Sequence, residues 1–225
     1  MRLCETKKLH YGEYIYKIEI YNGLAGHFRT ERQRAGKLSW TKQVLDELNA
    51  TIRSTDEQVI VSRGRFNYPI STTNFYDAIN LYRILLKHDC YKIRVEVNTL
   101  FIYTNDRDFC TKIINQCAVA NFWEPNPNKL AALQSDKNII LVDKEPEYQY
   151  KVTLGPKKGQ PSLAKWVDAN PKLAKMGDVA KEECLHNGWV KGYYFYVKNS
   201  QTLLIAELMV GDNIARLEKL VYVAE

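Results

Sequence analysis

Short segments of the chain either alternate apolar and polar residues or are wholly apolar, and both patterns predict β-strands. The clearest is 14–21, where β-branched and aromatic side chains recur. Segments 91–97 and 99–104 also alternate, and the short turn between them predicts a hairpin. The remaining predicted strands are 58–62, 118–123, 138–142, 148–154, 193–198 and 215–223.

Other segments place apolar residues three and four positions apart, which is the spacing of an amphipathic helix. Segment 72–88 keeps this spacing over several turns, and Ser71–Thr73 provides a capping start. Asp106 is expected to cap a helix over 107–116, because its carboxylate can accept hydrogen bonds from the free amides of the first turn. The other predicted helices are 41–52, 162–169, 179–186 and 201–210.

This order of strands and helices predicts an α+β protein with an internal repeat. Tyr16–Ile20 resembles Tyr150–Leu154, and Ile102–Asp106 resembles Tyr196–Ser200. The repeat predicts two ferredoxin-like-type halves, each with strand–helix–strand units on an antiparallel sheet, and with insertions in the first half. The alternatives are one continuous α+β domain, or a chance similarity between two capped strand–helix units.

The boundary between the halves is expected at Lys144–Glu147, which is the most linker-like stretch of the chain. This gives an N-terminal half, 1–144, that carries the basic loops, and a C-terminal half, 145–225. A chain of 225 residues is long enough for two cores of this size.

The composition excludes several classes of protein. Hydrophobic residues make up 45% and charged residues 26%, which excludes a disordered chain, a collagen-like chain and a small disulfide scaffold. The five Cys include no closely spaced pair, so we expect reduced, mostly buried thiols and no zinc site. No segment is typical of a signal peptide or a membrane span, which predicts a cytoplasmic protein, in the host cytoplasm if the chain is viral.

The formal net charge is +6, and two predicted loops, 27–37 and 62–69, are notably basic. Cations of this kind bind phosphates, and neighbouring aromatic rings can stack on bases. The candidate nucleic-acid-binding residues are Arg29, Arg32, Arg34, Lys37, Arg63, Arg65, Phe66 and Tyr68, with Lys157 and Lys158 in a third loop. The competing interpretations are a solvated loop for the first, a hairpin turn with its aromatic side chains in the core for the second, and a plain exposed turn for the third.

Candidate catalytic groups are few. His27 lies inside a basic loop and is the best candidate for a general acid or base. His88 and His186 are expected at helix C-termini, where a cation complements the helix dipole. Asp106 and Asp108 could ligate Mg²⁺, but capping explains Asp106. The chain has no GxSxG, HExxH or GxGxxG motif, so we expect no cofactor and no metal, and a binding function is favoured over an enzymatic one, which the sequence leaves open.

Aromatic residues provide a second way in which the chain could bind nucleic acid. In Tyr193–Tyr196 every position is aromatic, so both faces of that strand carry rings. One face would pack in the core, and the other could stack bases as on an RRM-like sheet, or be buried against a partner. The nearest match to the RNP1 pattern, Lys191–Phe195, lacks its small residue.

Three segments, Phe101–Asp106, Phe122–Pro127 and Gly211–Arg216, resemble segments of uncharacterised proteins encoded by tailed phages. The resemblance covers mainly residues 90–225, and its motifs are structural in character. It implies a viral origin and no particular activity.

The leading hypothesis from the sequence is a nucleic-acid-binding protein that binds RNA or DNA largely without sequence preference through loops 27–37 and 62–69. The first alternative is a structural or interaction subunit of a viral or polymerase assembly, with a protein partner or a second copy of the chain. The second alternative is a metal-independent ribonuclease that uses His27.

Overall fold

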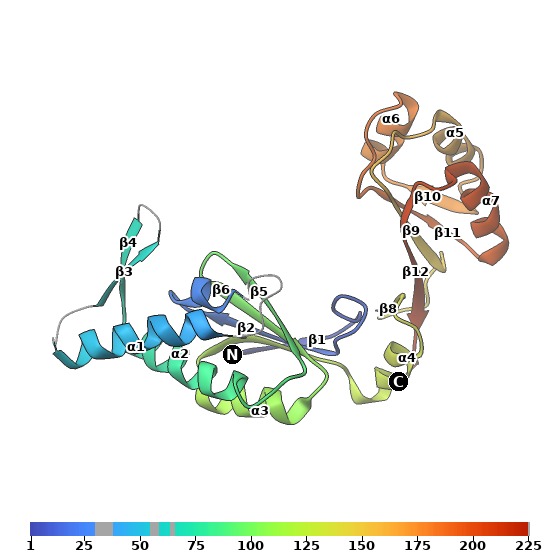
Figure 1. The fold of residues 1–225 in the computed structure, drawn as a ribbon. Helices are drawn as coiled ribbons and strands as arrows, with labels where there is room; N and C mark the ends of the chain where they lie inside the picture. The colour runs from blue at the N-terminus through green and yellow to red at the C-terminus, as the bar shows by residue number, and fades with distance from the viewer. Residues whose placement is uncertain (30–37, 55–58, 64–65, 225) are drawn as a thin grey trace. The chain divides into compact units, whose positions relative to one another are not determined.

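The computed structural model describes residues 1–225 apart from 30–37, 55–58, 64–65 and 225 (Figure 1). The chain forms two compact units. The first unit comprises Met1–Thr6 and Glu13–Asn126, and the second comprises Lys7–Gly12 and Pro127–Glu225. Each unit contains a five-stranded sheet together with helices, which confirms the predicted α+β class.

The first unit contains a five-stranded sheet, a separate hairpin and the helices between them. Its strands are β1 (Arg2–Glu5), β2 (Tyr16–Tyr21), β3 (Val59–Arg63), β4 (Phe66–Ile70), β5 (Tyr91–Glu96), β6 (Thr99–Thr104) and β7 (Val119–Glu124). Its helices are η1 (Ala25–Phe28), α1 (Ser39–Ser54), α2 (Thr72–Leu85) and α3 (Arg107–Gln116).

The second unit is built in a similar way but is shorter. Its strands are β8 (Ile139–Val142), β9 (Tyr150–Leu154), β10 (Ala174–Met176), β11 (Tyr194–Val197) and β12 (Ile214–Tyr222). Its helices are η2 (Pro127–Lys129), α4 (Leu130–Ser135), α5 (Pro161–Ala169), α6 (Asp178–Leu185) and α7 (Ser200–Val210). Strands β1 and β10 were not predicted, because three or four residues are too few to display an alternating pattern. Strand β4 was also missed, because most of it lies in segment 62–69, which was predicted as a basic loop.

The boundary between the units differs from the predicted one. It lies after Asn126 rather than after Lys144, and the short segment Lys7–Gly12 also belongs to the second unit. The reason is β8, which pairs in parallel with β12 and so completes the second sheet. Strands that pair in parallel at such a distance in sequence leave no local pattern that shows their pairing. The Pro-containing segment 144–147, which follows β8, therefore resembled the boundary between the halves.

The two sheets have the same topology. The first has the order β1-β7-β2-β6-β5, and the second, from its corresponding edge, has the order β8-β12-β9-β11-β10. In both, the first strand in sequence pairs in parallel with the last, and all other neighbours are antiparallel. The segment from β2 to β5 in the first unit carries α1 and the β3–β4 hairpin in addition to a helix, which confirms the predicted insertions.

A matching irregularity shows that the correspondence extends to single residues. In β7 the register against β2 shifts at Ala120, and in β12 the register against β9 shifts at Ala215. Each shift leaves one extra residue in the last strand of its sheet, which is a β-bulge. Aligned on these bulges, Lys17 corresponds to Lys151, as the sequence repeat predicted.

The second part of the sequence repeat needs a correction of one residue. Tyr103 lies opposite Lys17, and Tyr196 lies opposite Lys151, so these two tyrosines correspond. The sequence comparison instead matched Ile102 to Tyr196. A shift of one residue exchanges the two faces of a strand, and this is why sequence similarity alone set the wrong register.

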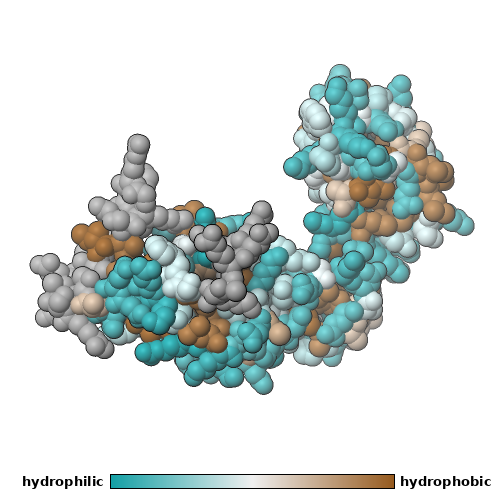
Figure 2. Space-filling model, in the orientation of Figure 1, coloured by the Kyte–Doolittle hydropathy of each residue, from teal (hydrophilic) through white to brown (hydrophobic). Residues whose placement is uncertain are grey.

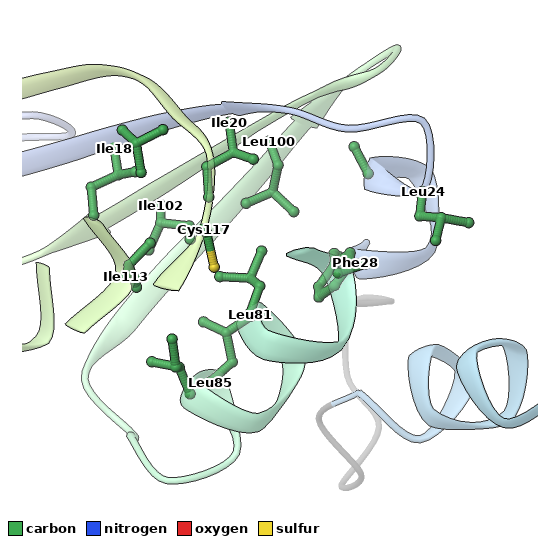
Figure 3. Packing of buried hydrophobic residues seen from close by; sticks show 14 of the residues in the cluster. Ile18, Ile20, Leu24, Phe28, Leu81, Leu85, Leu100, Ile102, Ile113 and Cys117 are labelled. Atoms are coloured by element: carbon green, nitrogen blue, oxygen red, sulfur yellow. The ribbon is translucent and has the colours of Figure 1, made fainter. Parts of the chain in front are cut away.

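Each sheet packs one face against its helices. In the first unit, Ile18 and Ile102 from the strands meet Leu81 and Leu85 from α2 and Ile113 from α3, and all five are almost fully buried (Figure 3). In the second unit, Val152, Leu154 and Phe195 form the equivalent layer. We call these the inner faces of the sheets, and the opposite sides the outer faces.

Helix α3 begins at the predicted cap. Asp106 Oδ1 accepts hydrogen bonds from the amides of Asp108 (2.8 Å) and Phe109 (3.0 Å). The bond from Phe109 lowers the pKa of the Asp106 carboxyl below its ordinary value. Asn199 caps α7 in the same way, with its Oδ1 accepting from the Thr202 amide at 2.9 Å.

Replacing the cap of α3 gives a first testable prediction. Asp106→Ala is expected to lower the free energy of unfolding of the first unit by about 1 kcal/mol, because it leaves first-turn amides without an acceptor. The contribution of the carboxylate is present at neutral pH and is lost as the pH falls through its lowered pKa. Urea titrations at pH 7 and at acidic pH measure both effects, and an unchanged midpoint at pH 7 would contradict them.

Candidate nucleic-acid interface

The outer face of the second sheet carries aromatic and basic side chains from its central strands. Lys151 of β9 lies opposite Tyr196 of β11 and Glu218 of β12, so these three side chains share one face. Tyr194 and Arg216 lie on the same face, opposite Thr153. The neighbours between them, including Phe195, point into the core.

Two tyrosine rings form the aromatic part of this face. The centroids of Tyr194 and Tyr196 are 5.5 Å apart in an edge-on arrangement, and Tyr194 is 44% exposed. Lys151 Nζ lies 4.1 Å from the centroid of the Tyr194 ring, a cation–π contact. Both tyrosines and Lys175 line a groove of about 360 Å³ at the β10 edge of the sheet. This groove places the tyrosine rings beside one cation, Lys175, and one carboxylate, Asp178, whose Oδ1 lies 3.5 Å from Lys181 Nζ.

A second groove, of about 440 Å³, is strongly basic and is lined by Lys8, Lys137 and Arg216. Glu218 lies beside these cations and is 2% exposed; it pairs with Lys8, and its Oε1 lies 3.6 Å from Arg216 Nη1. Burial lowers the pKa of Lys8, and the charges of Arg216 and Lys151 lower it further. Lys8, Arg216 and Lys151 therefore share one carboxylate, Glu218. The surplus positive charge favours the binding of an anion.

The outer face of the first sheet repeats part of this arrangement. Lys17 Nζ lies 4.4 Å from the centroid of Phe101 and 3.9 Å from that of Trp123. Burial between these rings lowers the pKa of Lys17. Tyr103 is nearly buried, with Tyr14 at 6.3 Å between ring centroids. Lys17 therefore contacts two rings of this face, and the third ring, Tyr103, is buried.

Corresponding positions in the two sheets carry the same kinds of side chain. Lys17 and Lys151 correspond, and each contacts a ring at the equivalent position, Phe101 or Tyr194. Lys92 and Lys175 also correspond, because each lies opposite the second ring of its sheet. The sheets differ at the last strand, where Trp123 corresponds to Glu218 and Asn121 to Arg216. The basic groove is therefore a property of the second unit.

Most of the candidates predicted in the two basic loops cannot be located. Arg32, Arg34, Lys37 and Arg65 lie outside the described residues. The backbones of Arg63, Phe66 and Tyr68 lie in the β3–β4 hairpin, while the positions of their side chains also lie outside the description. The predicted turn at 62–69 is therefore a hairpin, and its role in binding stays a prediction.

The other predicted residues lie at separate positions. Arg29 is exposed directly after η1, and His27 is half-buried in η1, where its carbonyl accepts a hydrogen bond from Thr41 Oγ1 at 2.7 Å. Lys157 pairs with Asp212, and Lys158 is exposed and forms a β-bridge with Trp189. Since Lys157 already has a carboxylate partner, its loop fits the exposed-turn interpretation.

Several predicted features of the chemistry can be compared with the structure. All five Cys are free; Cys110, Cys117 and Cys184 are buried, whereas Cys4 is half-buried and Cys90 is exposed. Burial raises the pKa of Cys110 and of Cys117 to about 12. Within the described ranges no cluster of three or more metal-ligating side chains is found. None of the helices in the described part of the chain is long and apolar enough to cross a bilayer.

Lys8 and Arg216 were missed by the sequence analysis. They are far apart in the chain and meet only because Lys7–Gly12 joins the second unit. The aromatic run at Tyr193–Tyr196 was the one local signal, and it did mark the correct strand.

Comparison of the chain with models of protein families, with curated proteins and with solved structures finds no match. The resemblance to phage-encoded proteins therefore stays a prediction. The chemistry of the site is therefore the basis on which its function is inferred.

Proposed function

We propose that this protein binds single-stranded nucleic acid, largely without sequence preference, on the outer face of the second sheet. The observation that carries the proposal is the position of two tyrosine rings between Lys175 on one side and the basic groove of Lys8 and Arg216 on the other. Rings stack on bases of any sequence, and cations bind the phosphate backbone.

The fold supports this use of the surface. We infer that each unit is a variant of the ferredoxin-like fold with one added edge strand, since β2, β5, β6 and β7 follow its strand order and are interrupted by helices. RRM domains bind RNA on a four-stranded sheet whose aromatic side chains stack with bases. The likeness is one of architecture and raises the expectation of binding at the sheet, while the named side chains supply the chemistry.

The salt dependence of binding tests the proposal. Fluorescence anisotropy with labelled single-stranded RNA and DNA is expected to show saturable binding that weakens as salt rises. If Lys8, Lys151 and Arg216 each neutralise one phosphate, the slope of log K against log salt is about −2. Arg216→Ala is expected to reduce that slope by about 0.7.

Two comparisons make this test specific. Lys165→Ala removes an exposed cation from α5 in the same unit and is the charge-matched control for Arg216→Ala. Double-stranded DNA of the same length hides its base faces, so it is expected to bind more weakly than the single strand. An absence of binding at low salt would overturn the proposed function.

One observation supports a second candidate function, that of an interaction subunit. Helix α7 exposes Leu204, Ile205 and Leu208, the last at 87%, and Figure 2 shows hydrophobic side chains gathered over this helix. Exposed apolar patches mark protein–protein contacts. Measuring the molar mass in solution tests whether this helix contacts a second copy of the chain. A mass above that of the monomer is expected if it does.

A further inference from the structure

The first unit has a groove on its helical side, between α2 and α3. The groove has a volume of about 360 Å³, which is large enough for a small ligand. Arg83 comes from α2, Lys87 and His88 follow that helix, and Lys112 comes from α3. Among the described residues that line the groove, none is acidic.

Arg83, Lys87 and Lys112 are the three permanently charged cations of this groove. Among the described residues, only Lys112 acts on a nearby carboxylate, Asp106, whose pKa is lowered by the bond from Phe109 and further by this charge. Arg83, Lys87 and Lys112 are exposed, and none of them forms a salt bridge with any residue in the described part of the chain. Elsewhere in the same unit, Lys42 pairs with Asp46 and Arg107 with Glu124. Three like charges around one hollow repel one another, and a bound anion would relieve that repulsion.

The walls of the groove are held by the core. The His88 ring stacks on Phe109 with 4.0 Å between centroids and 11° between planes, and its Nε2 lies 3.4 Å from Asp106 Oδ2. On the opposite wall, Asn80 Nδ2 donates a hydrogen bond to the carbonyl of Gln116 at 3.2 Å, which ties α2 to the end of α3. The groove is therefore formed before any ligand arrives, so little conformational entropy is lost on binding.

We propose that this groove binds a phosphate-bearing anion, with Arg83, Lys87 and Lys112 as its direct contacts. Arginine can bind two phosphate oxygens at once, and lysine supplies a mobile point charge. Among the described residues that line the groove, Phe109 is the only aromatic ring apart from His88, and at 1% exposure it cannot stack on a base. The ligand is therefore recognised by its phosphate oxygens.

Two kinds of ligand carry phosphate groups that this groove can bind: a free oligophosphate and the backbone of a nucleic acid. The site shares no residue with the outer face of either sheet. Its existence is therefore independent of the proposed function, and the two proposals can fail separately.

Isothermal titration of the full chain with inorganic tripolyphosphate at low ionic strength tests the site. The basic groove of the second unit also favours an anion, so the titration is made on an Arg216→Ala background, where we expect saturable binding of one ligand per chain. The double variant Arg83→Ala with Lys112→Ala is expected to weaken it roughly 10- to 100-fold, since each change removes a charged contact. The matched control is Lys165→Ala with Lys172→Ala, which removes two exposed cations from the second unit and is expected to change binding less than about twofold.

The outcomes distinguish a specific site in this groove from a general effect of net charge, and a nucleic-acid backbone from a free oligophosphate. No saturable heat, or an equal loss in both double variants, would overturn the site, because binding would then be absent or a general effect of net charge. Where the groove variant alone weakens binding, competition by a single-stranded oligonucleotide on a Tyr194→Ala background identifies the source. Displacement of tripolyphosphate indicates a nucleic-acid backbone, and its retention indicates a free oligophosphate.

Discussion

Phe195→Ala is expected to destabilise the second unit by about 3–5 kcal/mol, the range for removing a large aromatic side chain from a packed core. Phe195 is fully buried and lies in β11, an internal strand between β9 and β10. Its removal leaves a cavity against Val152 and the helices, and the pleated strands cannot collapse to fill it.

Hydrogen–deuterium exchange read by peptide is the suitable measurement, because it reports the two units separately. Peptides from β9 and β11 are expected to lose protection, while those from β2 and β6 of the first unit serve as the internal reference. The neighbouring Tyr194→Ala is the control, since Tyr194 lies on the opposite face and is 44% exposed. Equal loss of protection in the two variants would contradict the assignment of faces.

The second large effect concerns binding. Tyr194→Ala together with Tyr196→Ala is expected to weaken single-stranded nucleic acid binding by about 1–3 kcal/mol for each base that loses its stacking partner. For one lost stack this is roughly 5- to 150-fold. Lys151 also loses the ring beneath it, so its position over the sheet becomes less defined.

The control for this prediction retains the rings. Tyr194→Phe keeps the aromatic face and removes only the hydroxyl, so its affinity is expected to stay within about twofold of the unmodified chain, because stacking needs the ring alone. Anisotropy titrations at one fixed salt concentration compare the variants. If the Phe and Ala variants at position 194 lose the same affinity, the hydroxyl is the important group and the stacking model is wrong.

The elements of this fold could be predicted well from local patterns. The hairpin of β5 and β6, helix α3 with its Asp106 cap, and helix α7 with its Asn199 cap all lie within one or two residues of their predicted positions. Strand alternation and capping are interactions between near neighbours, so they are present in the sequence itself. The predicted repeat was also correct for β2 and β9.

The site was predicted less well, for a reason that particular residues make clear. The sequence drew attention to runs of basic residues such as 27–37, since charge density along the chain is easy to see. Lys151 and Arg216 are single cations on adjacent strands that lie far apart in sequence, and Lys8 belongs only to the pair Lys7–Lys8 near the N-terminus, so no basic run marks this site. Lys112 and Arg83 are equally isolated in sequence.

The sequence by itself determined the α+β class, the positions of most strands and longer helices, and the presence of two related halves, because these depend on side-chain periodicity and local hydrogen bonding. It missed β1, β4, β10 and the short helix α4. Only the tertiary structure decided which strands pair, where the units divide and which face each side chain occupies. β8 joins β12, and Tyr103 corresponds to Tyr196, through contacts between residues far apart in the chain. Those long-range pairings, and not local composition, bring the tyrosines and cations of the candidate site together.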